Sequence, residues 1–246
     1  MKNLYGDSFY KDRHNSTVYS AQRILSIIFE KFPEIRSAAD FGCGVGTWLS
    51  VLKEKCIEVH GFDGSWVPRK YLQIPEACFT SIDLNKDLIY QNSELWELPR
   101  YDLTIALEVA EHLPINSADT FIRFLTSHSN LVLFSAAIPG QGGTGHINEQ
   151  YPSYWCSLFE KYGFIPVDTI RDKIWNDEKI PFFYRQNCFL SLRKDFICSL
   201  SKQEYDYPLD RVHPQQFILE QERSQLTVSK ALKFIITECC KGFITH

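Results

Sequence analysis

The sequence predicts an α/β protein built on a doubly wound, mostly parallel seven-stranded sheet. Short apolar runs alternate along the chain with segments whose apolar residues recur at helical spacing. The first apolar run opens into a glycine-rich turn, and the next three each end on an acidic residue. Strands that alternate with helices are typical of a parallel sheet covered on both faces, with room for an antiparallel strand at its end.

The first predicted elements are a helix, a strand and a second helix. From Ser20 the apolar residues recur at helical spacing until Pro33 ends the pattern. The run 38–41 is short and apolar, which predicts a strand that leads directly into Gly42-Cys43-Gly44-Val45-Gly46. Helical spacing returns from Trp48, so this stretch is predicted to be a strand, a glycine turn and a helix.

Six further strands complete the predicted sheet. The first three cover 57–62, 78–82 and 101–107 and end at Asp63, Asp83 and Glu108. A helix over 118–127 leads to a strand over 131–137, which breaks into the glycine-rich loop 139–145. We predict a helix over 151–162, closed by Gly163, and strands over 164–170 and 186–192 with an aromatic and charged loop between them.

The pattern changes near residue 196. Pro208 and Pro214 bracket a predicted linker, and 215–240 is mainly helical in its spacing. We therefore expect a main domain over 1–195 and a helical C-terminal extension over 196–246, which shapes a binding site or forms a homodimer interface.

Composition limits the function classes. A chain of 246 residues can bury a full core without disulfides or metal, and its net charge of -4 argues against a general nucleic-acid binder. The eight cysteines show no metal-ligand or bridge spacing, so we expect reduced thiols and no metal site. The apolar stretch 131–138 is too short to span a bilayer, and 1–9 is polar with no secretory segment behind it, so we expect a cytoplasmic protein that does not bind membranes.

The acidic strand ends point to one ligand crevice. In an open α/β sheet ligands bind outside the carboxyl ends of the strands, where the strand order reverses. The glycines let backbone N–H groups approach a ligand closely. Asp63 lies nineteen positions after Gly44, where a carboxylate can accept both ribose hydroxyls of a nucleoside. A dinucleotide fingerprint would need a small residue at Thr47, so NAD is not expected.

The pattern Asp-x-Gly-x-Gly-x-Gly from Asp40, with further acidic residues after the next strands, resembles the S-adenosylmethionine site of class I methyltransferases. The resemblance covers about three quarters of the chain. The segment Leu107-Glu108-Val109-Ala110-Glu111-His112-Leu113 is similar to the Glu-His-Leu signature of many small-molecule members. The stretch 142–150, followed by Tyr154-Trp155 and Phe159, resembles a bacterial subgroup found beside glycan and natural-product genes.

The resemblance implies a role for each cofactor-site residue. The loop around the methionine moiety would comprise Asp40, Gly42, Gly44 and Gly46, and Asp63 would hold the ribose. Asp83 would accept from the adenine amino group while Leu84 packs on the base, and Leu107 and Glu108 would lie beside the sulfonium and amino-acid end. Tyr10 and Ser20 would close over the cofactor.

Several of these residues also have a structural interpretation. Asp83 could instead cap the turn that follows it. Glu111 and His112 could be a helix-start carboxylate and a histidine that orients the loop. His146 lies in a glycine-rich loop at the crevice end, where core packing explains a polar residue poorly, so function is favoured there.

The sequence therefore predicts an S-adenosylmethionine-dependent O-methyltransferase whose acceptor is a small molecule, glycan or natural product. His146 is the predicted base for the acceptor hydroxyl, with Glu149 and His112 as alternatives. N- or carboxyl-methylation and a non-catalytic nucleoside-binding module are the competing interpretations. A nucleic-acid methyltransferase would usually carry Asn/Asp-Pro-Pro-aromatic after the fourth strand, where this chain has Glu108 to Leu113.

Overall fold

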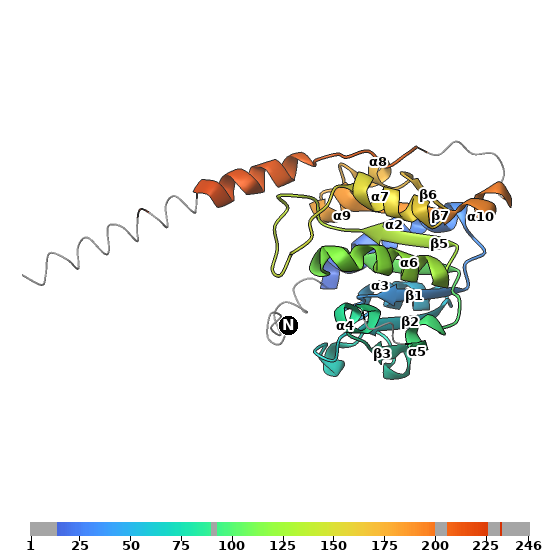
Figure 1. Cartoon of the computed structure of the whole chain (residues 1–246). Coiled ribbons are helices and arrows are strands. Elements are labelled where there is room, and N and C mark those ends of the chain that lie inside the picture. Colours follow the sequence, from blue (N-terminus) through green and yellow to red (C-terminus); the bar gives the residue numbers. More distant parts are fainter. Residues whose placement is uncertain (1–13, 90–92, 200–205, 226–231, 233–246) are drawn as a thin grey trace, which may run out of the picture. The chain divides into compact units, whose positions relative to one another are not determined.

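The computed structural model describes residues 14–89, 93–199, 206–225 and 232 of the chain. Close contacts divide the chain into two compact units, Met1–Arg211 and Val212–His246. The first unit contains a single seven-stranded sheet with helices on both faces, and Figure 1 shows the strands stacked from β3 at one end to β6 at the other. The predicted boundary between a main domain over 1–195 and a C-terminal extension over 196–246 stays a prediction.

The sheet confirms the predicted fold class. Its strand order is β3 (Phe79–Ser81), β2 (Glu58–Asp63), β1 (Ser37–Phe41), β4 (Leu103–Leu107), β5 (Leu131–Ser135), β7 (Phe189–Arg193) and β6 (Phe164–Val167). Every neighbouring pair is parallel except those of β7, which runs antiparallel to both β5 and β6. The strand order reverses between β1 and β4, so the carboxyl ends of these strands flank the expected crevice.

Each face of the sheet has its own apolar core. On β1, Ala38 belongs to one core and its neighbour Ala39 to the other, because successive side chains of a strand point to opposite faces. The first core includes α2 (His14–Lys31) and α3 (Thr47–Glu54). The second includes α4 (Leu84–Ile89), α5 (Ser93–Trp96), α6 (Ala118–His128) and α7 (Pro152–Lys161). These two layers hold the strands rigidly and thereby fix the positions of their ends.

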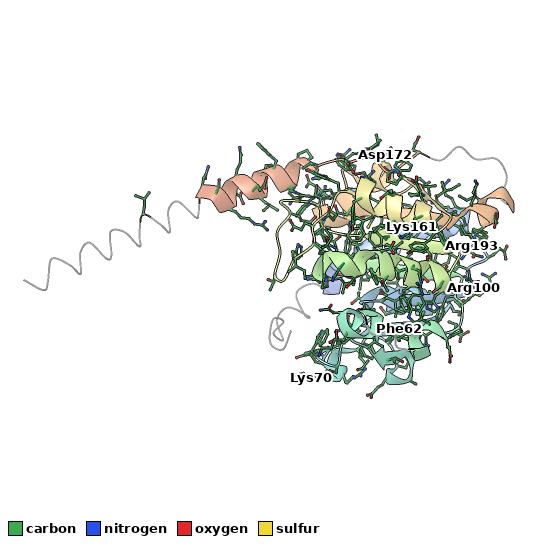
Figure 2. All side chains as sticks on the ribbon, viewed as in Figure 1. Phe62, Lys70, Arg100, Lys161, Asp172 and Arg193 are labelled. Carbon is green, nitrogen blue, oxygen red and sulfur yellow. The ribbon has the colours of Figure 1, made fainter. Side chains whose placement is uncertain are left out.

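The end of the sheet that lies opposite the crevice is closed by two arginines, which lie close together in Figure 2. Arg100 precedes β4 and Arg193 ends β7, and both donate to the side-chain oxygen of Asn130, at 2.6 and 2.9 Å. Arg100 also donates to the Ser127 carbonyl. These bonds satisfy polar groups where the loops meet, at the end of the sheet away from the glycine turn.

The structure corrects the prediction between β6 and β7. The predicted loop contains α8 (Arg171–Ile174) and α9 (Phe182–Asn187), so the strands are shorter than predicted: β6 ends at Val167 and β7 begins at Phe189. Pro181 directly precedes α9, and Gln186 and Asn187 belong to this helix, where both donate to the side-chain oxygen of Gln141. These polar bonds, which the apolar pattern does not register, hold the two residues in the helix, so the strand begins later than predicted. A short helix, α10 (Lys194–Ser199), follows β7.

The second unit contributes a helix over 214–225 to the described residues. The predicted helix over 215–240 is thus confirmed as far as 225, and 226–231 and 233–246 lie outside the described residues. Phe217 and Ile218 on this helix are more than half exposed. None of the described helices combines the length and apolarity needed to cross a bilayer. The described cysteines, Cys43, Cys56, Cys78, Cys156 and Cys188, are free thiols, as expected.

Candidate active site

A cavity of about 400 Å³ lies at the carboxyl ends of β1, β2 and β4. Its size is in the range of small-molecule sites. Five acidic side chains contribute to its lining, namely Asp40, Asp63, Asp83, Glu108 and Glu111. Among the described residues, no lysine or arginine lines it. The cavity therefore presents carboxylates and backbone groups and lacks fixed positive charge.

The glycine turn after β1 forms one wall of the cavity. Gly42 and Cys43 donate their N–H groups to the Phe62 carbonyl, at 2.7 and 3.2 Å, which ties the turn to β2. Gly44 has φ +55°, and a Cβ placed on it would meet no atom within 4 Å, so its open side faces free space. Gly46 precedes α3 and a Cβ there would contact Ile74 at 2.9 Å. Gly46 thus serves packing, and it is absent from the cavity lining.

Asp63 at the end of β2 orders this turn. One carboxylate oxygen accepts the Gly44 N–H at 2.7 Å and the other accepts the Gly64 N–H at 2.6 Å. A carboxylate has about four lone-pair sites, so two remain for further donors. Burial raises the pKa of Asp63, and the two backbone bonds oppose that effect. Asp63 is therefore placed to hold the turn and a pair of hydroxyls at the same time.

Asp40 lies deeper in the same wall. It is buried near the end of β1, and burial together with the neighbouring Asp63 raises its pKa well above the usual carboxyl range. A cationic group placed beside Asp40 would favour its ionised form. An ammonium such as that of a methionine moiety has this chemistry.

Asp83 and Leu84 line the cavity beyond β3. Asp83 also accepts the Lys86 N–H at its side chain, at 3.3 Å, directly before α4. The capping geometry considered for Asp83 is thus present, and it coexists with a place in the cavity wall. Trp66 lines the cavity as well, and it fits because Gly64 has no Cβ: one placed there would lie 2.1 Å from the indole ring.

Glu108, directly after β4, is held by an amide network. Its φ of +55° is rare for a residue other than glycine. Its carboxylate accepts from the side-chain amides of Gln141 and Asn187, at 2.9 and 3.1 Å, and its N–H donates to Ser135. Burial raises its pKa, and these hydrogen bonds oppose the shift. The strained backbone thus carries a carboxylate of fixed orientation into the cavity.

Glu111 and His112 form one wall of the other end of the cavity. Both belong to the short 3₁₀ helix Ala110–His112. The loop after β5 docks on this helix, because Ile147 and Asn148 donate their N–H groups to the Glu111 carbonyl, at 2.9 and 3.0 Å. His146 thereby packs edge-on against His112, with ring centroids 4.9 Å apart. Two loops that follow different strands meet here.

His146 is oriented by Glu149. Its Nδ1 lies 2.8 Å from a Glu149 oxygen, and the Glu149 carboxylate also accepts the N–H groups of Gly140 and Gly142. A carboxylate ion can only accept, so Nδ1 carries the hydrogen and Nε2 is left as the nitrogen that can accept or coordinate. Glu149 does not line the cavity. The geometry makes it a positioning residue for His146.

The structure brings most of the predicted site residues together. The cavity is lined by Asp40, Gly42, Gly44, Asp63, Asp83, Leu84, Leu107, Glu108, His112 and His146. Ser20 is fully buried in α2 outside the lining, where Thr17 is found instead. Tyr10 lies outside the described residues.

Sequence reasoning missed Trp66, Gln141 and Asn187. The amide pair Gln186-Asn187, which interrupts an apolar run, was a signal for the last of these.

Comparisons with known proteins agree with this fold. A family profile described as a methyltransferase domain matches residues 12–169, more than half of the chain. No curated protein matches the sequence. Magnesium protoporphyrin IX methyltransferase from Synechocystis, solved with bound S-adenosylmethionine, is 18% identical with a TM-score of 0.53, and the match covers 78% of this chain and 88% of that one.

Two other solved structures are similar to the same degree. An amino pentose methyltransferase from Micromonospora echinaspora, involved in calicheamicin biosynthesis, is 12% identical with a TM-score of 0.53, covering 78% of this chain and 99% of that one. DesVI from Streptomyces venezuelae is 11% identical with a TM-score of 0.53, covering 76% and 96%. At these identities the likeness concerns the fold alone.

The fold and the family profile together define the class. This chain belongs to the methyltransferase domain family, and it is an S-adenosylmethionine-dependent methyltransferase of class I. The residues present fit that cofactor. Gly44 leaves open space beside the turn, and Asp63 keeps two lone-pair sites for ribose hydroxyls.

Proposed function

We propose that this enzyme methylates a hydroxyl group of a sugar, glycan or natural-product small molecule. The observation that carries the proposal is the acceptor end of the cavity, where Glu111, His112 and His146 gather without any lysine or arginine among the described lining residues. Such a site disfavours phosphate-rich acceptors, nucleic acids included. Carboxylate and imidazole groups bind hydroxyls well, which suits a neutral acceptor.

We also propose which of the lining residues hold the cofactor. Backbone groups of Gly42 and Gly44 would surround the methionine moiety, with Asp40 beside its ammonium. Asp63 would accept the ribose hydroxyls, while Asp83 and Leu84 would hold the adenine. S-adenosylmethionine, when bound, supplies an electrophilic methyl group on a sulfonium.

Leu107 and Glu108 also line the cavity, and on this proposal the acceptor oxygen aligns with the methyl group beside them. Holding two reactants in line removes much of the entropic barrier of a bimolecular step. The amide network around Glu108 keeps this part of the cavity from rearranging. The acceptor hydroxyl is then activated by the group formed by Glu111, His112 and His146.

Methyl transfer to a panel of acceptors tests the function. The full chain is incubated with labelled S-adenosylmethionine and with neutral sugars, glycosides and phenolic metabolites, and S-adenosylhomocysteine release is measured together with the mass of the product. We expect turnover with a hydroxylated acceptor and none with oligonucleotides. Cofactor binding without release of product for any acceptor class would favour a non-catalytic binding module.

An amine acceptor is the second candidate, on one observation. The carboxylate of Glu111 has no side-chain hydrogen-bond donor among the described residues, and it would pair with an acceptor ammonium. A carboxylate acceptor is less suited to this acidic cavity. Amino sugars and their hydroxyl counterparts, assayed side by side, separate N- from O-methylation.

We further assign the chain to the cytoplasm and the C-terminal extension to the acceptor side or to a homodimer. The exposed Phe217 and Ile218 on the helix over 214–225 support an interface role. Truncation after Arg211, where the first compact unit ends, should leave cofactor affinity largely intact and alter acceptor turnover or the oligomeric state. A folded truncated protein that no longer binds cofactor would contradict this division.

A further inference from the structure

We propose that Glu111, His112 and His146 bind a divalent metal ion at the acceptor end of the cavity. One ligand atom from each of the three side chains lies within 4.8 Å of the others. The sequence shows no metal-ligand spacing, because the ligands come from two loops that lie more than thirty residues apart. This inference rests on the proposed function and deepens it.

The Glu111 carboxylate supplies the first argument. The residue is fully buried, and no side chain among the described residues donates a hydrogen bond to its carboxylate, which has only the backbone N–H groups of Glu111 and Ala137 beside it. An isolated buried carboxylate is costly, and buried charges are normally paired or coordinate metals. One of its oxygens lies 4.0 Å from Nε2 of His146. Glu111 thus faces the two histidines with lone pairs that no side chain occupies.

The histidines supply the second argument. His112 Nδ1 lies 3.2 Å from the Gly145 carbonyl, which can only accept, so this nitrogen carries the hydrogen. His146 Nδ1 likewise carries a hydrogen, because its partner, the Glu149 carboxylate, only accepts. In each ring Nε2 is therefore the nitrogen that can coordinate a metal ion. A histidine whose other nitrogen donates to a carboxylate or carbonyl is the usual arrangement of metal-bound histidines.

Charge balance supplies the third argument. Glu108, Glu111 and Glu149 surround the two histidines, and the first and third both act electrostatically on Glu111. Within the part of the chain that the structure describes, the only ion pairs of Glu111 and Glu149 are with His146. No lysine or arginine neutralises this group there. A divalent cation would supply the missing positive charge.

Two imidazoles and one carboxylate select a particular metal class. This ligand set suits divalent first-row transition metals such as manganese, iron, cobalt and zinc, and it leaves positions open for water or substrate. The ligand atoms have to approach one another to share one ion. The loop that carries His146 contains Gly142 and Gly145, both at positive φ, which permit that adjustment.

The bound ion would activate the acceptor. A hydroxyl coordinated to a divalent ion has a lowered pKa, so its proton passes to water and the alkoxide stays on the metal. The oxygen then forms the new C–O bond as the S–C bond breaks, and the electron pair of that bond remains on sulfur. No oxidation or reduction takes place. On this proposal His146 acts as a ligand, and the ion itself acidifies the hydroxyl.

Cobalt binding tests the site directly. The full chain is treated with a chelator and titrated with Co²⁺, and binding is followed by calorimetry and by the visible absorption of bound cobalt. We expect one ion per chain. Glu111→Gln, His112→Asn and His146→Asn should each lower the affinity by more than about 100-fold, since losing a residue that only orients a ligand already costs about 10–100-fold. Glu149→Gln should lower the cobalt affinity only by about 10–100-fold, because Glu149 orients His146 and does not bind the ion itself.

His60→Asn is the matched control, because His60 lies on β2 with its Nε2 bonded to Thr80 and should leave cobalt binding unchanged. Far-UV circular dichroism establishes that each variant is folded. Equal cobalt affinity in Glu111→Gln and the parent chain, or no stoichiometric binding by the parent chain, would overturn the metal site.

Chelation separates this inference from the proposed function. Cofactor affinity should survive chelation, whereas hydroxyl methylation should fall at least about 100-fold and return with added Mn²⁺ or Co²⁺. Full methylation by the chelated enzyme would refute the metal and leave the function standing, with His146 as a direct base. Metal binding without methylation of any hydroxylated acceptor would refute the function and keep the site.

Discussion

The Asp63 carboxylate accepts the backbone N–H of Gly44 at 2.7 Å, so the end of β2 fixes the turn that follows β1. The same side chain accepts from Gly64 and borders the cavity. The order of the turn and the wall of the cavity thereby depend on one carboxylate. Substitutions at either residue should consequently affect the cofactor end before the acceptor end.

Replacing Asp63 tests this link. Asp63→Ala should weaken S-adenosylmethionine binding by about 1–3 kcal/mol, because ribose hydroxyls and the Gly44 N–H lose an acceptor in a buried site. Isothermal titration calorimetry measures the change. Asp119→Asn, on α6 and bonded to Lys161, is the control and should bind normally. Unchanged affinity in Asp63→Ala would remove Asp63 from the cofactor site.

Gly44 offers a second test with a close control. Gly44 and Gly163 both have positive φ, and neither has an atom within 4 Å of an added Cβ. Alanine at either position should cost about 1–2 kcal/mol of stability, measured by urea denaturation. Only Gly44→Ala should also abolish cofactor binding, because its methyl group enters the cavity. Normal binding by Gly44→Ala would mean that the cofactor does not approach this turn.

His146→Ala should lower turnover by about 100- to 10,000-fold while cofactor affinity stays within about threefold. The residue lies at the acceptor end, away from Asp63 and the glycine turn. Steady-state kinetics with the true acceptor, combined with calorimetry, measures both quantities. His112→Ala is compared under the same conditions. Near-normal turnover in His146→Ala with collapse in His112→Ala would transfer the main role to His112.

His128 should make the protein sensitive to acid. Burial and the nearby Arg100 lower the pKa of His128 to about 4, and its ring packs against Phe41 and Phe124. The folded state therefore favours the neutral ring. Its contribution is present above the unfolded pKa of about 6.5 and is lost as pH falls from about 6.5 to about 4, by about 3 kcal/mol in all.

Urea denaturation at several pH values measures this loss. His128→Phe should flatten the profile between pH 6.5 and 4, because an uncharged ring keeps the contacts with Phe41 and Phe124. An identical acid dependence in the parent chain and His128→Phe would show that other groups cause it.

The acidic strand ends could be predicted because they depend on local pattern alone. Asp63 and Glu108 each follow an apolar run, and parallel strands bring their carboxyl ends to one edge of the sheet. The spacing from Gly44 to Asp63 predicted that both residues border one crevice, and both line the cavity. Knowledge of the fold class thus predicted most of the cavity wall.

The acceptor end could not be predicted in the same way. Contacts between Glu111 and His146 arise from two loops that meet only after folding, and no short-range spacing records them. The sequence predicts that Asn187 belongs to a strand over 186–192, whereas the structure places it at the end of α9. Its contact with Glu108 joins residues 79 positions apart, which periodicity cannot reveal.

The position of β7 sets an order in which the enzyme can be completed during its synthesis. Within the described sheet β6 pairs with β7 alone, yet β7 is the later of the two to leave the ribosome. Until it inserts, β5 has an open edge and β6 has no strand beside it. Asn187, which holds Glu108, emerges just before β7. A nascent chain that ends before this point has the glycine turn but lacks the amide that holds Glu108, so this wall of the cavity is complete only after nearly the whole of the first unit has been made.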